Sequence, residues 1–234
     1  MALILNIDTA TPVCSVALAR NGKLLALREK NEKNIHAEIL TQFIMEVIAE
    51  AECSLADLDA VAVSKGPGSY TGLRIGVSTA KGLCYSLDIP LIGIGTIDSM
   101  AHFAAQELQG KFNEQDLFLP TIDARRMEIY GAFYNHKLEA QTEVKPHILD
   151  ENSFSEEGEN KKIILTGDGA AKCQEIFKER DEIKIYPDIH CSSQGMIQLS
   201  EEAFNKQNFE DVAYFEPFYL KEFIAGIPKV KGLR

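Results

Sequence analysis

The start of the chain alternates short apolar runs with turn residues, a pattern that predicts a three-stranded antiparallel meander. Apolar side chains dominate residues 3–8 and 14–19. Asn21-Gly22 follows the second run and is a typical hairpin turn, because both residues tolerate positive φ. Residues 23–28 are therefore expected to return as the third strand.

After this meander the apolar spacing becomes that of helices alternating with buried strands. Residues 34–51 carry apolar side chains at helical spacing over an arc of roughly 220°. A helix lying on one sheet needs an arc of only about 100° or somewhat more, so this helix has apolar surface for a second contact, within the chain or with another. Strands at 58–63 and 90–94 and helices at 71–87 and 96–109 complete a β-β-β-α-β-α-β-α order.

The second half of the chain repeats the first in weaker form. Residues 119–140 align with residues 4–26, and Asp123 falls on Asp8 at an offset of 115. In both segments a strand ends in Ile-Asp, a second strand follows, and an Asn-started turn comes next. The recurrence of these features in the same order indicates a duplicated α/β fold.

Two lobes with a cleft between them follow from this repeat. We place the first lobe at residues 1–98 and the second at residues 99–234, with the repeat starting near residue 115. The second lobe is expected to be reduced, with a polar, mobile surface loop at 150–162. Further elements expected there are a strand at 163–165, helices at 170–180 and 194–206, and an aromatic-rich end at 215–223 that tucks under the body.

Composition and charge narrow the classes of function. Hydrophobic residues make up 45% of the chain and charged residues 25%, which is ordinary for a soluble globular protein. There are 35 acidic and 24 basic side chains, a net charge of −11. Direct binding of nucleic acid is disfavoured, because phosphate contacts need clustered Lys and Arg. A role in nucleic-acid chemistry would need a partner that supplies the positive surface.

Cysteine usage and the apolar runs indicate a cytoplasmic protein. The five cysteines are scattered without a CxxC pair, as expected for free thiols in a reducing compartment. The first apolar run has no basic region before it, and no apolar stretch approaches the ~18 residues needed to span a bilayer. We therefore expect no contact with the membrane.

The most informative segment is KGPGSYTGLRIGVSTAKG at residues 65–82. Its first glycines make a tight turn after a buried strand, and Ser69 or Thr71 can cap the helix that follows. Small residues then recur at every fourth position from Gly72 to Cys84, along one side of the helix, which lets another group pack very close. Three groups fit this description: a phosphate at the helix start, the chain's own sheet, or a helix of another protein.

With this motif and ILNIDTATPVCSVAL near its start, the chain resembles the bacterial TsaB family of tRNA threonylcarbamoyladenosine biosynthesis. The resemblance covers nearly the whole length, is strongest over residues 4–100, and is looser at GDGA (167–170) and PFYLK (217–221). It implies the two-lobed fold of actin, the heat-shock ATPases and the sugar kinases. It also implies a non-catalytic subunit of the homologous enzyme TsaD, which transfers a threonylcarbamoyl group to an adenosine beside the anticodon of tRNA.

The same resemblance implies the partners and the docking surface. The family works with TsaD and with a small ATPase, TsaE, and tRNA is reached indirectly through the complex. The two homologues dock through helices of their first lobes, here those at 35–51 and 71–87. In isolation, the same apolar patch is expected to drive homodimerisation. The contact residues expected on these helices are Ile39, Phe43, Val47, Arg74, Ile75 and Ser78.

Nucleotide binding is implied only in degenerate form. Relatives of this fold hold ATP phosphates on glycine turns, and the corresponding residues here are Asp8, Gly66, Gly68 and Thr71. The turn after Asp8 has no glycine, and a Cβ there obstructs the close backbone approach of a phosphate. We expect no required cofactor; ATP or ADP held at the partner interface fits better than ATP turnover, and a purely structural turn is the alternative.

Catalytic and metal-binding residues are not expected. The catalytic relatives bind a metal through an HxxxH pair, whose spacing puts both imidazoles on one face of a helix. No two of the five histidines are four residues apart, and the equivalent positions align near Thr96 and Met100. Ser69, Ser78 and Cys84 carry no nucleophile signature.

Other function classes stay open. An independent enzyme of the same fold, either an ATP-dependent phosphotransferase or a glycoprotease-like peptidase, would need a working cleft between the lobes. A stand-alone regulatory module would not. The basic pair Arg125-Arg126 and the basic tail at 229–234 are expected to be solvated surface, with contact between the tail and RNA as the alternative.

Overall fold

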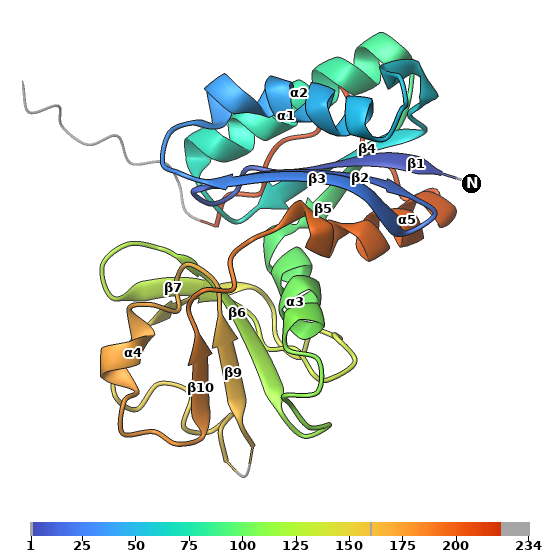
Figure 1. Cartoon of the computed structure of the whole chain (residues 1–234). Helices are drawn as coiled ribbons and strands as arrows, with labels where there is room; N and C mark the ends of the chain where they lie inside the picture. Colours follow the sequence, from blue (N-terminus) through green and yellow to red (C-terminus); the bar gives the residue numbers. More distant parts are fainter. Residues whose placement is uncertain (1, 160, 221–234) are drawn as a thin grey trace, which may run out of the picture.

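The computed structural model describes residues 2–159 and 161–220, which form two lobes, one above the other in Figure 1. Each lobe is built on a five-stranded mixed sheet, ordered β3-β2-β1-β4-β5 in the first and β8-β7-β6-β9-β10 in the second. The strands of the first sheet are β1 (Leu3–Asp8), β2 (Val13–Arg20), β3 (Lys23–Asn31), β4 (Ala60–Gly66) and β5 (Leu91–Gly95). Those of the second are β6 (Leu117–Asp123), β7 (Glu128–Gly131), β8 (Lys145–Ile148), β9 (Ile163–Thr166) and β10 (Ile183–Tyr186).

The two sheets share one topology. In each, the central strand pairs antiparallel with the next strand and parallel with the fourth, and the fifth strand adds parallel to the fourth. The central strands also end alike. The backbone N–H of Ala10 donates to Asp8 Oδ1 at 2.9 Å, and that of Arg125 donates to Asp123 Oδ1 at 2.7 Å. The predicted duplicated α/β fold is confirmed, down to the turn that follows each Asp.

Two helices cover the outer face of the first sheet. They are α1 (His36–Glu50) and α2 (Tyr70–Leu87), which lie side by side on the side away from the second lobe (Figure 1). A short 3-10 helix, η1 (Leu55–Asp57), precedes β4. Apolar residues of both helices join those of the sheet in one buried cluster, which includes Leu40 and Ile44 of α1. The predicted helices therefore form where the helical spacing placed them.

The last helix of the first half packs against the second sheet. This is α3 (Thr96–Glu107), which follows β5. Its residues Ile97, Met100 and Ala101 are buried together with Phe118 and Ile122 of β6. The expected boundary between residues 98 and 99 lies within α3, whose apolar side packs on the second lobe. The position of the boundary stays a prediction.

The end of the second half packs in turn against the first sheet. A 3-10 helix, η2 (Ser193–Met196), leads into α5 (Ile197–Asn205), which runs under that sheet (Figure 1). Met196 and Ala203 are buried against Ile4 of β1, Ala62 of β4 and Ile92 of β5. Residues 193–205 were expected in the second lobe but lie on the first, because they cover the apolar lower face of its sheet.

The second lobe is reduced, with four-residue strands at β7 to β10. The helix expected at 170–180 is confined to α4 (Cys173–Ile176). The neighbouring turns are held by tertiary contacts, since Lys172 binds carbonyl oxygens after β6 and Arg180 binds those of Glu151 and Ser153. Such contacts outweigh helix propensity. The loop expected to be mobile at 150–162 is anchored by Phe154, whose side chain is buried in the lobe's core.

The last part of the described chain runs along the first lobe, and we call residues 208–220 the strap. The backbone N–H of Glu210 donates to Leu91 O at 2.9 Å, which places the strap beside β5. Phe215 is buried in the core cluster of the first lobe. Residues 221–223 of the expected aromatic end and the basic tail at 229–234 lie outside the described residues. Within the part of the chain that the structure describes, no helix is long and apolar enough to cross a membrane.

Candidate functional site

The first residues of the small-residue row on α2 pack against the chain's own turn after β1, and Ala80 and Cys84 further along it lie in the lobe's core. A Cβ added at Gly68 would clash with Ala10, and one added at Gly72 or Gly76 would clash with Thr9. Thr9 Oγ1 donates to Gly72 O at 2.8 Å, so the turn after β1 is bonded to the helix as well as packed on it. Of the three groups that the spacing allowed, the close neighbour is therefore the chain itself.

The amides at the start of α2 are used within the same turn. The backbone N–H of Ser69 donates to Ala10 O at 2.6 Å, and that of Gly72 donates to Ser69 Oγ at 3.2 Å. Gly66 has a φ of +109°, and a Cβ there would meet the backbone oxygen of Phe218. The Ser69 and Gly72 amides are therefore already bonded, and Ala10 and the strap abut Gly68 and Gly66, so this part of the motif packs as a tight turn.

Three of the four residues expected at a nucleotide site meet at the carboxyl ends of β1 and β4. Asp8 is only 1% exposed, and burial raises the pKa of its carboxyl. Its Oδ1 accepts from Ala10, while its Oδ2 has no hydrogen-bond partner among the described residues. Gly66 ends β4 and Gly68 packs against Ala10, two residues after Asp8. Thr71 is exposed on α2. Binding of ATP or ADP stays a prediction.

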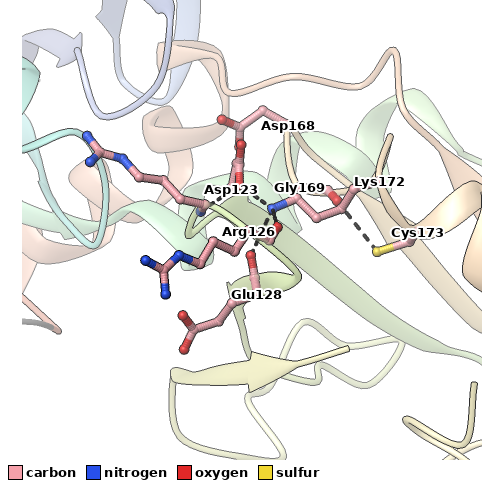
Figure 2. A network of polar contacts seen from close by, with 8 residues as sticks. Asp123, Arg126, Glu128, Asp168, Gly169, Lys172 and Cys173 are labelled. Atoms are coloured by element: carbon pink, nitrogen blue, oxygen red, sulfur yellow. Dashed lines mark hydrogen bonds and ion pairs between the residues drawn. The ribbon is translucent and has the colours of Figure 1, made fainter. Parts of the chain in front are cut away.

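The corresponding turn of the second lobe is held by a lysine (Figure 2). Lys172 Nζ forms an ion pair with Asp123 and donates to Arg126 O at 2.8 Å and to Glu128 O at 3.0 Å. The backbone N–H of Asp123 donates to Asp168 Oδ1 at 3.2 Å, and burial raises the pKa of Asp168 to about 6. The alignment of Asp123 with Asp8 pointed to this turn, but no sequence signal pointed to Lys172.

The positions that align with the metal-binding histidines of catalytic relatives have structural roles. Thr96 Oγ1 accepts a hydrogen bond from the backbone N–H of Gly66 at 3.1 Å. Met100 is buried in a core cluster with residues of β6 and β9. In the described part of the chain, no group of three or more His, Cys, Asp or Glu side chains is arranged to hold a metal ion. Cys84 is a core residue, and burial raises the pKa of its thiol to about 11.

A groove of about 620 Å³ opens where the lobes meet the strap. It is lined by Asp98 of α3, Tyr134, residues 140–144 and Phe218. Tyr134 Oη donates to Asp98 Oδ1 at 2.6 Å across its wall. The described lining includes none of the residues expected to bind a nucleotide, so this groove is separate from the turns around Asp8.

The residues expected to dock a partner divide into three groups. Ile39, Phe43 and Ile75 are half-buried on the edge of the first-lobe core. Arg74 and Ser78 are exposed on α2. Val47 is 0% exposed, so the expectation that it contacts a partner is corrected: its side chain faces the sheet and belongs to the core.

The outer face of α1 and α2 also carries apolar side chains that the spacing argument did not single out. Met45 on α1 is 55% exposed and Tyr85 on α2 is 85% exposed. At Gly82, between Ser78 and Tyr85, an added Cβ would find open space. The face is therefore apolar at several points and open along the middle of α2.

Comparison with known proteins places this chain in a family. The family profile described as "TsaD: tRNA N6-adenosine threonylcarbamoyltransferase" matches residues 23–229. The chain is similar to the tRNA threonylcarbamoyladenosine biosynthesis protein TsaB of Escherichia coli (strain K12), with 31% identity over 95% of this chain and 96% of that protein. It is similar to TsaB of Bacillus subtilis (strain 168), with 33% identity over 57% and 56% of the two chains.

A solved structure shows the same fold. YeaZ from Pseudomonas aeruginosa superposes with a TM-score of 0.72 at 24% identity, covering 94% of this chain and 100% of that one. At this identity the likeness concerns the fold alone, and the family assignment rests on the sequence matches. The chain therefore belongs to the TsaD family and, within it, to the TsaB proteins.

Proposed function

We propose that this chain is a non-catalytic subunit that binds a TsaD-type enzyme through α1 and α2 and activates threonylcarbamoyl transfer to tRNA. The observation that carries the proposal is the outer face of these helices. These helices carry half-buried Ile39, Phe43 and Ile75 and exposed Met45 and Tyr85. Large apolar side chains left in contact with water are typical of a surface that a partner covers.

The absence of catalysis is supported by what occupies the equivalent positions. Thr96 and Met100 stand where catalytic relatives carry metal-binding histidines, and both are engaged in packing or backbone contacts. Gly68 and Gly72, which could approach a phosphate, face the chain's own turn. The chemistry would then reside in the partner. The role of this chain is to stabilise the active arrangement of that partner by contacts that only this arrangement makes.

The rest of the proposed assembly is carried over from the family resemblance. A TsaE-type small ATPase joins the complex, and tRNA is bound through the partner, since a chain of net charge −11 is a poor phosphate binder. No cofactor is required, and the partner interface is the place where ATP or ADP would bind. Without the partner, the same face covers itself in a homodimer, and the complex works in the cytoplasm.

The proposal is tested by reconstituting threonylcarbamoyl transfer to tRNA from the TsaD-type enzyme, the TsaE-type ATPase and the adenylate-forming enzyme, with and without this chain. We expect activity to require the chain and to be lost with Phe43→Asp, which puts a charge on the docking face. Ile148→Asp is the matched control, because Ile148 is an apolar residue 79% exposed on β8 of the other lobe. Activity that is indifferent to the chain would overturn the proposal.

A further inference from the structure

Three side chains meet at the start of α2, and we call Tyr70, Arg74 and Tyr219 the anchor. The guanidinium carbon of Arg74 lies 4.1 Å from the centroid of the Tyr70 ring, a cation–π contact. Arg74 Nε donates to Tyr219 Oη at 3.4 Å. The rings of Tyr70 and Tyr219 are 5.1 Å apart at an angle of 40°. Arg74 is therefore positioned by two aromatic residues, one of which belongs to the strap.

The strap is tied to the first lobe just before Tyr219. The backbone N–H of Phe218 donates to Lys65 O at 2.6 Å. Lys81 Nζ on α2 donates to the backbone oxygens of Ala213 at 3.1 Å and Phe215 at 3.0 Å. These bonds bring Tyr219 to α2 although 145 residues separate it from Arg74. The position of Tyr219 is thus set by the lobe itself.

Among the described residues, the Arg74 guanidinium forms one hydrogen bond and keeps donors for another group. A guanidinium has five N–H donors, and the bond to Tyr219 uses Nε alone. Among the described residues, no carboxylate lies within ion-pair distance of Arg74. The bond to Tyr219 raises the pKa of the Arg74 guanidinium, and Glu216 of the strap is close enough to add a smaller effect in the same direction. The side chain is exposed, and it is the one charged residue among the six expected on the docking face. The two Nη groups of a guanidinium form a planar fork of N–H donors. A planar carboxylate is the acceptor that fits this fork.

We propose that the anchor binds a carboxylate of an Asp or Glu side chain on the TsaD-type partner, with Arg74 as the binding residue and Tyr219 as the residue that positions it. The inference rests on the proposed function, because it names what the partner presents to one end of the docking face. It also makes the strap, which comes from the far end of the chain, part of that face.

The test measures the affinity of the full-length chain for the TsaD-type partner by titration calorimetry, without nucleotide. Arg74→Lys keeps the charge but loses the fork, and we expect it to weaken binding about tenfold. Tyr219→Phe keeps the ring but loses the hydroxyl, and we expect a loss of about threefold. The double variant should bind only as weakly as Arg74→Lys, since Tyr219 acts through Arg74.

Two controls separate the possible failures. Tyr214→Phe removes a hydroxyl from an 84% exposed tyrosine of the same strap and should leave binding unchanged. Phe43→Asp tests docking itself. If Phe43→Asp abolishes binding while Arg74→Lys does not weaken it, the inference fails and the proposed function stands. If the parent chain does not bind the partner, both fail.

Two further results would overturn the inference. Additive losses from Arg74→Lys and Tyr219→Phe would mean that Tyr219 does not act through Arg74. An effect of Arg74→Lys that appears only after ATP or ADP is added would identify the acceptor as a phosphate and not a carboxylate. The unfolding midpoints of Arg74→Lys, Tyr219→Phe and Tyr214→Phe should match that of the parent, which excludes loss of fold as the cause. Phe43→Asp is measured at a temperature below its own midpoint, because Phe43 is half-buried.

Discussion

At the scale of the residue, two glycines of α2 differ in whether the surrounding structure requires them. Gly72 faces the turn after β1, and an added Cβ would meet the backbone oxygen of Thr9. Gly82 lies ten residues further along the same helix, and nothing lies within 4 Å of a Cβ added there. The first glycine is required by a close backbone approach, whereas the second is not required by packing.

We therefore expect opposite effects from the same substitution at these two positions. Gly72→Ala should lower the free energy of unfolding by about 1 to 3 kcal/mol, because the backbone of Thr9 must move. Gly82→Ala should raise it by up to about 1 kcal/mol, since alanine is a better helix former. Urea denaturation of both variants measures the difference. Equal effects would show that the turn after β1 does not pack on α2 as described.

The buried carboxyl of Asp168 predicts a dependence of stability on pH. Burial raises the pKa of Asp168 to about 6 from a usual value of 3.8, so the folded state holds a proton there that the unfolded state has lost. The associated stability is fully present below about pH 4 and is lost as the pH rises through 6. In Asp168→Asn, stability should no longer fall as the pH rises, because an amide does not ionise. Its oxygen can still accept the hydrogen bond from the backbone N–H of Asp123.

Denaturation of the parent and of Asp168→Asn at a series of pH values measures this contribution. The variant should be the more stable one at pH 7, by on the order of 1 to 3 kcal/mol, since a pKa unit corresponds to about 1.4 kcal/mol. The difference should vanish near pH 4, where both forms are neutral. A difference that grows on acidification would contradict the assignment.

At the scale of the element, α1 shows how far a periodic pattern can be interpreted. The spacing predicted a helix with more apolar surface than one sheet needs, and the helix forms at His36–Glu50. Part of this additional apolar surface is covered within the lobe, where Ile39 and Phe43 pack at the edge of the core. Val47 faces the sheet although it was expected on the free side, because the arc alone does not say where the sheet ends.

The strap shows why an edge strand brings in a distant segment. β5 is the last strand of the first sheet, and an open edge leaves backbone groups unpaired. Glu210 pairs with Leu91 there, in a contact between residues far apart in the sequence. The strap thus covers the edge and carries Tyr219 to α2. If the anchor acts as proposed, an element that completes the sheet also completes the docking face.

At the scale of the whole molecule, each half of the chain supplies a helix that packs on the sheet of the other half. α3 of the first half packs on β6, and η2 and α5 of the second half pack under the first sheet. The two halves are also bonded directly, since the backbone N–H of Ser193 donates to Ser15 Oγ at 2.8 Å. A molecule built this way should unfold as one unit, because neither sheet keeps its core without the other half.

Truncation tests this dependence. A chain that ends at residue 191 lacks η2, α5 and the strap, so the buried lower face of the first sheet becomes exposed to water. We expect it to lose its single cooperative transition in calorimetry and to aggregate. A chain that ends at residue 220 keeps every described contact and is the control. An unchanged midpoint for the shorter chain would mean that the first lobe is stable alone.

The order of strands and helices in the first half, the hairpin at Asn21, the duplication and the family all followed from the sequence by itself. These features depend on local spacing, on turn chemistry and on a motif within one segment, so the residues that determine them are neighbours in the chain. The equivalence of Asp8 and Asp123 could be predicted because each residue ends the first strand of its own half of the repeat.

Only the tertiary structure decided which group packs against the small residues of α2 and that Val47 is buried. It also decided that α5 packs on the first sheet and that Tyr219 contacts Arg74. Each depends on contacts between residues distant in the sequence, 63 positions apart for Thr9 and Gly72 and 145 for Arg74 and Tyr219. No local pattern encodes such a pairing. It arises because apolar faces and unpaired backbone groups are covered by whichever segment the finished fold brings beside them.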